Sequence, residues 1–71
     1  MRKNAKITKT ICKRIRKYRH EAGLTQEDLA EKVRVSRVYI GYVEQGRNTP
    51  SLEILGKIAK VLKVRLSDIV E

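Results

Sequence analysis

Residues 24–46 constrain the fold of this chain most, because they contain the start signals of two short helices in close succession. Thr25 favours the N-cap position of a helix, and Asp28 stands three residues after it, which is the spacing of a capping box. Ser36 supplies a second N-cap soon afterwards. We therefore expect one helix over residues 26–33, a tight turn, and a second helix over residues 37–45.

Apolar residues at helical spacing give each of these two helices one buried face. The inward positions are Leu29, Ala30, Val33, Ile40, Val43 and Glu44. The opposite face of the helix over 37–45 carries Arg37, Val38, Gly41, Tyr42 and Gln45. This outward face is the part of the segment that can contact a partner.

Helical patterns also occupy most of the remaining chain. A helix that begins near Thr8 or Thr10 and ends at Gly23 would bury Ile11, Cys12, Ile15 and Tyr18. A helix opened by Pro50 and Ser51 would bury Leu52, Leu55, Ile58, Ala59 and Leu62, and one more short helix fits Leu66, Ile69 and Val70. The sequence thus predicts an all-α domain of five helices over residues 10–71, preceded by a flexible basic arm over residues 1–9.

Basic residues are concentrated at the N-terminus of the chain. Residues 1–20 contain nine bases and no acid, and the remaining residues contain eight bases and all eight acids, so the net charge of +9 comes from the first 20 residues. The nine are Arg2, Lys3, Lys6, Lys9, Lys13, Arg14, Arg16, Lys17 and Arg19. Such a distribution favours a polyanionic partner, the alternative being a basic tail that only keeps a small protein in solution.

The composition argues against several classes of protein. Cys12 is the single cysteine, so there is no internal disulfide, and no paired Cys and His ligands suggest a metal site. No apolar run approaches the roughly 18 residues of a transmembrane helix, and we expect a cytoplasmic protein. No nucleophile, base and orienting group occur together, so we expect no enzyme, no cofactor and no small-molecule ligand.

The segment over 24–46 resembles the helix-turn-helix of the phage repressor and Cro family of DNA-binding domains, the XRE-like transcriptional regulators. The resemblance rests on Gln26, the small Ala30, Ser36 in the turn, Ile40 and Val43 beneath the second helix, and Glu44-Gln45-Gly46 at its end. It extends through residues 48–52 and 57–60 and back to residues 13–17. It implies a compact five-helix repressor-like fold and a homodimer that binds double-stranded DNA at a near-palindromic operator.

The helix over 37–45 then becomes the recognition helix in the major groove, where three outward residues would contact base edges: Arg37, Val38 and Tyr42. Arg37 can donate two hydrogen bonds to guanine, or it can bind a phosphate instead. Gly41 lowers helix stability, and either a close approach to DNA or a neutral substitution explains it.

The resemblance also implies contacts that hold the protein on the DNA backbone. The expected phosphate ligands are Gln26, Ser36, Gln45, Arg47 and Asn48, and the expected arm contacts are Arg2, Lys3 and Lys6. Gln26 would in addition support the residue at position 37. In this family an arginine and a glutamate form a largely buried ion pair, which here would join Arg19 to Glu44.

Three positions depart from the family pattern. Arg34 and Lys63 replace the glycines that usually follow the second and fourth helices, where a left-handed backbone would strain them. Arg65 stands where a Ser or Thr would cap the last helix.

Leu66, Ile69 and Val70 carry more apolar surface than one short helix readily hides, so we expect the C-terminal region to hold the dimer together.

Several functions stay open from the sequence. Repression is the more frequent outcome in the family, but an activator such as a restriction-modification controller would have the same sequence features. An antitoxin or another protein-interaction module is a second possibility. Nonspecific binding of RNA or DNA through charge alone is a third.

Overall fold

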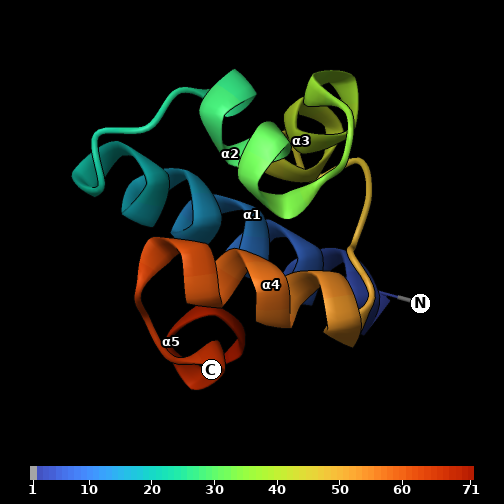
Figure 1. The fold of residues 1–71 in the computed structure, drawn as a ribbon. Coiled ribbons are helices and arrows are strands. Elements are labelled where there is room, and N and C mark those ends of the chain that lie inside the picture. The colour runs from blue at the N-terminus through green and yellow to red at the C-terminus, as the bar shows by residue number, and fades with distance from the viewer. Residues whose placement is uncertain (1) are drawn as a thin grey trace.

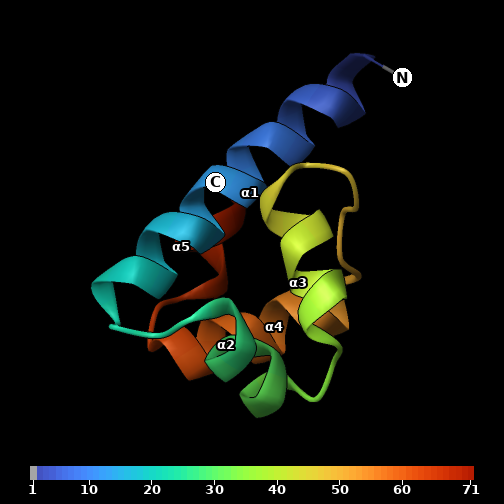
Figure 2. The same cartoon turned by 90° about the horizontal axis from the view of Figure 1, so that it is seen from above.

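The computed structural model describes the backbone of residues 2–71 and the side chains from residue 9 onward. Five helices make up the fold: α1 (Arg2–Glu21), α2 (Gln26–Val33), α3 (Arg37–Glu44), α4 (Leu52–Leu62) and α5 (Leu66–Val70). The described residues contain no strand, so the predicted all-α class is confirmed. Figures 1 and 2 show the four shorter helices gathered around α1, whose first turns project beyond them in Figure 2.

Every helix contributes one side chain with no exposed surface to a single core. These five residues are Ile15, Leu29, Ile40, Ile58 and Ile69, in the order of the helices. Burial of such a side chain stabilises a fold by roughly 1.5–3 kcal/mol, so no helix is dispensable for the core. The predicted inward faces of α2 and α3 are all buried.

Side-chain caps start three of the helices as the sequence predicted. The hydroxyl of Thr25 accepts a hydrogen bond from the Asp28 amide at 3.0 Å, and the Asp28 carboxylate accepts one from the Thr25 amide at 3.0 Å. The Ser36 hydroxyl accepts from the amide of Tyr39 at 3.0 Å, and that of Ser51 from the amide of Ile54 at 3.3 Å. These bonds satisfy amides that a helix start otherwise leaves unpaired.

Left-handed residues end four of the helices. Gly23 and Gly46 have φ angles of 74° and 76°, and Arg34 and Lys63 have φ angles of 71° and 60°. The two cationic residues therefore adopt the strained conformation that the sequence predicted for them. A β-carbon in this conformation costs roughly 1–2 kcal/mol, which glycine avoids.

Two predictions about the fold were wrong. Helix α1 begins at Arg2 rather than near Thr8 or Thr10, because no Pro or Gly interrupts the chain before Gly23. The side chains of residues 1–8 lie outside the described ones, and the division into an arm and a domain stays a prediction. Leu52 is 71% exposed rather than buried, because it is the first residue of α4, whose buried residues begin one turn later at Leu55.

The C-terminal helix hides more of its apolar surface than we expected. Ile69 is completely buried, and Leu66 and Val70 are partly buried against the core. Arg14 of α1 reaches the carbonyl oxygen of Ile69 at 3.5 Å. Helix α5 has no Ser or Thr at its start. Instead, the Asp68 carboxylate accepts a hydrogen bond from the Arg65 amide at 2.9 Å. The apolar patch predicted from Leu66, Ile69 and Val70 is therefore smaller than the sequence suggested.

Candidate nucleic-acid interface

One face of helix α3 packs in the core. The opposite face, which carries both polar and apolar side chains, is exposed. Ile40 and Val43 anchor it, and α2 packs against it across the turn that contains Arg34 and Ser36. Arg37, Val38 and Tyr42 are exposed, the side chain of Val38 by 55% and that of Tyr42 by 44%. Large apolar groups exposed on a helix that a rigid core holds in place are suited to contact a partner.

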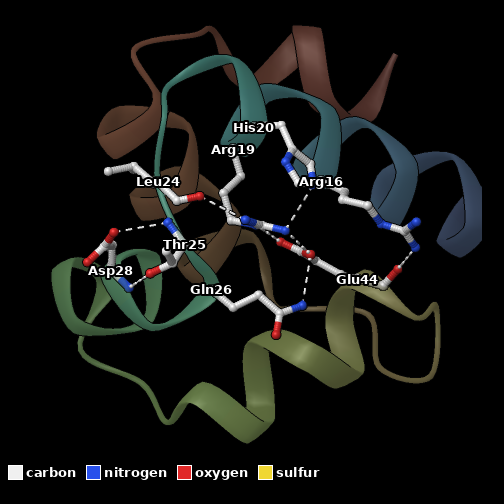
Figure 3. Close-up of polar contacts among 8 residues, drawn as sticks. All are labelled: Arg16, Arg19, His20, Leu24, Thr25, Gln26, Asp28 and Glu44. Carbon is white, nitrogen blue, oxygen red and sulfur yellow. Dashed lines mark hydrogen bonds and ion pairs between the residues drawn. The ribbon is translucent and has the colours of Figure 1, made fainter.

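A buried ion pair fixes α3 to α1, as shown in Figure 3. Arg19 donates from Nε to Oε2 of Glu44 at 2.6 Å and from Nη2 to Oε1 at 3.0 Å, so the pair is bidentate. Both residues are buried, with 7% of Arg19 and 2% of Glu44 exposed. The ion pair that the family resemblance implied is present. Its planar, two-bond geometry restricts both the position and the rotation of α3.

Arginine side chains of α1 also bind backbone carbonyl groups near the motif. Arg16 donates to the carbonyl oxygen of Glu44 at 2.9 Å, at the C-terminal end of α3. Arg19 donates to the carbonyl oxygen of Leu24 at 2.8 Å, just before α2. The role of Arg16 was not predicted, although its position three residues before Arg19 places both on one face of α1. Arg19 and Arg16 of α1 thus bind the backbone just before α2 and at the end of α3, respectively.

The Gln26 side chain has a partner that was not predicted. Its Nε2 donates to Oε1 of Glu44 at 3.1 Å, so the amide joins the buried ion pair (Figure 3). No hydrogen bond between Gln26 and Arg37 occurs among the described residues, although both line a hollow of about 420 Å³ between the ends of α1, α2 and α3. A β-carbon at Gly41 would approach Oε1 of Gln26 at 3.9 Å, which is ordinary contact. The small size of Gly41 is therefore not required by this neighbour.

The residues after α3 form a connected polar edge. The Arg47 guanidinium lies over the Tyr42 ring at 4.9 Å from its centroid and reaches Oε1 of Gln45 at 3.5 Å. Asn48 follows and is exposed. The structure thus brings Tyr42, Gln45 and Arg47 together, whereas Ser36 lies at the other end of α3 with its hydroxyl oxygen capping the helix. Predictions for Arg2, Lys3 and Lys6 fall on side chains outside the described ones.

Hydrogen bonds at the start of α2 change the acidity of one side chain. The Thr25 amide and hydroxyl hold the pKa of the Asp28 carboxyl below its ordinary value of 3.8, because both hydrogen bonds favour the charged form. Lys32, one turn later, acts in the same direction. A carboxylate at this position also complements the positive end of the helix dipole.

Other kinds of site find no support in the described part of the chain. No group of three or more metal-ligating side chains occurs there. No helix there is long and apolar enough to cross a membrane. The Cys12 thiol is buried and donates to the carbonyl oxygen of Lys9 at 3.1 Å, as a small core residue does.

Comparison with known proteins identifies the fold family. The sequence profile of the helix-turn-helix family matches residues 15–69, which run from within α1 to within α5 and include all of α2, α3 and α4. The chain belongs to this family. An uncharacterized helix-turn-helix transcriptional regulator of Archaeoglobus fulgidus is 46% identical over 56 residues, which are 79% of this chain and 80% of that protein. The immunity repressor of Bacillus phage phi105 is 43% identical over 61 residues, 86% of this chain and 42% of the repressor.

Solved structures of regulators have the same arrangement. The restriction-modification controller protein C.AhdI of Aeromonas hydrophila superposes with a TM-score of 0.83 at 32% identity, over 87% of this chain and 94% of the controller. The biofilm master regulator SinR, solved in complex with DNA, superposes with a TM-score of 0.81 at 34% identity, over 86% of this chain and 98% of SinR. Family membership makes this chain a DNA-binding transcriptional regulator of the XRE type, and such regulators are not enzymes.

Proposed function

We propose that this helix-turn-helix regulator binds a near-palindromic operator as a homodimer, reads base edges with α3, and represses transcription. The observation that carries the proposal is the exposed face of α3, which a buried, bidentate ion pair holds rigidly against α1. Rigid placement matters, because base readout depends on hydrogen bonds and methyl contacts with strict geometry. The phi105 relative is an immunity repressor, which favours repression.

Each residue has a definite task in this proposal. Arg37, at the first turn of α3, donates to guanine O6 and N7, and Val38 contacts a thymine methyl group. Tyr42 lies one turn further on and presents its ring and hydroxyl to the next base or phosphate. The side chains proposed to donate hydrogen bonds to the phosphate backbone are those of Gln26, Ser36, Gln45, Arg47 and Asn48.

Two copies per site follow from the small size of one recognition helix. A single α3 with three outward side chains reads only a few base pairs, and a second copy on a related half-site multiplies specificity. Leu66 and Val70 remain partly exposed on α5 and provide apolar surface for the contact between copies. That surface is small, so the dimer is completed on DNA rather than in free solution.

An activating role is the second candidate. It is favoured by the match to C.AhdI, a restriction-modification controller of which this chain covers 94%. The operator and the DNA contacts are the same under both roles. Transcription from a promoter that carries the selected site, with and without the protein, separates them by the direction of the change.

Selection of bound duplexes from a random pool tests the proposal. We expect a palindromic consensus whose half-sites lie about one helical turn, or a multiple of it, apart. Sedimentation of the protein with the selected duplex should give two protomers per site. A one-to-one complex on an asymmetric site would refute the dimer, and the absence of any consensus would leave only nonspecific binding.

A further inference from the structure

A second hollow lies across α2 from the recognition helix. It has a volume of about 720 Å³, and its apolar lining includes Leu24 and Val61. In Figures 1 and 2 the loop before α2 and the C-terminal end of α4 lie on one side of α2, and α3 lies on the other. A duplex bound to the outward face of α3 therefore leaves this hollow accessible.

Three lysines surround the apolar lining, and no acidic residue does. They are Lys32 in the last turn of α2, Lys60 in the last turn of α4, and Lys63 directly after α4. Within the described part of the chain no carboxylate is within ion-pair distance of them, since the one pair there joins Arg19 to Glu44. Two acids of α2 stand close to Lys32 in the sequence: Glu31 directly precedes it, and Asp28 lies one turn earlier with its carboxylate accepting from the Thr25 amide. The three ammonium groups are available to an external anion.

The backbone at Lys63 is strained, as it is at Arg34. Its φ of 60° is left-handed, and glycine would adopt this conformation without strain. A cation near a helix C-terminus gains a few tenths of a kcal/mol to about 1 kcal/mol from the dipole, which does not exceed the strain of roughly 1–2 kcal/mol. Strained residues persist more often where they serve a binding site.

We propose that this hollow binds an acidic peptide segment of a partner protein. One apolar side chain of the segment enters between Leu24 and Val61, and flanking carboxylates contact Lys32, Lys60 and Lys63. The charge of the lining selects such a segment, because carboxylates on both sides of an apolar anchor match an apolar floor inside a cationic rim. The inference is independent of which bases α3 reads.

Titration followed by amide chemical shifts tests this assignment. The probe is a panel of synthetic peptides in which one Leu, Ile or Phe is flanked by glutamates, and the matched panel has glutamine in place of glutamate. We expect the acidic panel to shift the amides of Leu24, Val61 and Lys63, and the glutamine panel to leave them in place. The same shifts should appear when α3 is already bound to duplex DNA.

A charge-matched pair of variants makes the test specific. The triple variant Lys32→Gln, Lys60→Gln, Lys63→Gly, called the rim variant, removes the three positive charges around the hollow. Glycine at position 63 also removes the backbone strain. The control variant Lys9→Gln, Lys13→Gln, Lys57→Gln removes the same charge from exposed lysines elsewhere. We expect the rim variant to bind the acidic peptide at least tenfold more weakly and the control to bind nearly as well as the parent.

Four results would overturn the proposal. The first is an equal loss of affinity in both variants, which would mean nonspecific attraction to a basic protein. The second is the same amide shifts with inorganic phosphate alone, which would make the hollow a simple anion site. The third is shifts at these amides caused by duplex DNA, which would assign the hollow to the DNA interface. The fourth is no binding by any acidic peptide.

Discussion

At the scale of single residues, Glu44 accepts the hydrogen bonds that hold α3 in place. Its two carboxylate oxygens accept from Arg19 and Gln26, and its own carbonyl oxygen accepts from Arg16. A carboxylate with 2% exposure is tolerable only with such partners, because burial of a charge costs several kcal/mol. The position of the reading helix therefore depends on one side chain that has no contact with DNA in our proposal.

Replacing Glu44 by alanine should destabilise the fold by roughly 3–5 kcal/mol, because it leaves the Arg19 guanidinium buried without its partner. That loss is a large part of the stability of a small domain. Urea denaturation followed by circular dichroism measures it. The double variant Arg19→Met, Glu44→Leu serves as the control and should recover much of the stability. A Glu44→Ala midpoint equal to that of the parent would mean that the ion pair contributes nothing.

Glycine at the two strained positions should stabilise the fold. Arg34→Gly and Lys63→Gly each remove a β-carbon from a left-handed residue, and we expect a gain of up to about 1 kcal/mol after the entropy cost of glycine. Thermal denaturation measures it. Lys57→Gly, in the interior of α4, is the matched control and should lose about 1 kcal/mol. Equal losses at all three sites would show that residues 34 and 63 are unstrained.

At the scale of helices, the capping box of α2 links stability to pH. The pKa of Asp28 is lowered in the folded chain, so its contribution is fully present above the ordinary value of 3.8 and is lost as the pH falls through the lower folded-state pKa. Melting temperatures of the parent and Asp28→Asn should therefore converge as the pH decreases below 3.8. A constant difference across that range would contradict the assigned protonation.

The hydroxyl half of the same capping box makes a separate prediction. Thr25→Ala removes the acceptor of the Asp28 amide and should cost about 1 kcal/mol at neutral pH. Thr25→Ser is the control, because it keeps the hydroxyl oxygen in place and should retain most of the stability. Chemical denaturation of both variants measures the difference. Equal losses in both would show that the methyl group of Thr25, rather than its oxygen, stabilises α2.

The helices were predictable wherever a local signal marks them. Thr25, Ser36 and Ser51 are hydroxyl caps, and each stands directly before the helix that it was expected to start. The start of α1 was missed because residues 2–9 contain no apolar stripe, and because Thr8 and Thr10, which are both suited to cap a helix, stand inside α1 instead. The exposure of Leu52 was missed because a helical stripe does not reveal where the neighbouring helices end.

The sequence predicted which residues of the site face outward, but it did not predict all of the hydrogen bonds that join residues of the site to one another. The outward positions of Arg37, Val38 and Tyr42 follow from the period of α3, and the resemblance to a known family supplied the pair of Arg19 and Glu44. The bond between Gln26 and Glu44 joins residues far apart in sequence, and it depends on how α2 and α3 cross. A single sequence contains no signal for such a contact.

At the scale of the whole molecule, the basic residues that would attract DNA and the residues proposed to read its sequence lie in different parts of the chain. The first 20 residues carry the entire net charge of +9, whereas the helix that we propose to read bases contains one arginine and one buried glutamate. Long-range attraction by basic groups accelerates encounter with DNA of any sequence. Specificity then rests on the few exposed side chains of α3.

Neutralising Arg2, Lys3 and Lys6 to glutamine should weaken binding to all duplexes alike. If these side chains contact phosphates, the slope of log affinity against log salt decreases by up to about one for each lost contact. The rim variant of Lys32, Lys60 and Lys63 is the charge-matched control and should leave the slope nearly unchanged. Fluorescence anisotropy over a range of salt concentrations measures both. Identical slopes in the two variants would mean that the arm makes no phosphate contacts.

The most direct test of base reading by α3 is the affinity of the parent and Arg37→Ala for the selected duplex and for each of its single-base variants. We predict that Arg37→Ala loses roughly 1–3 kcal/mol on the selected duplex and no longer distinguishes the base at one position of each half-site, while preferences elsewhere remain. If Arg37→Ala instead weakens every duplex equally and keeps all base preferences, Arg37 is a phosphate ligand and the proposed reading of guanine is wrong.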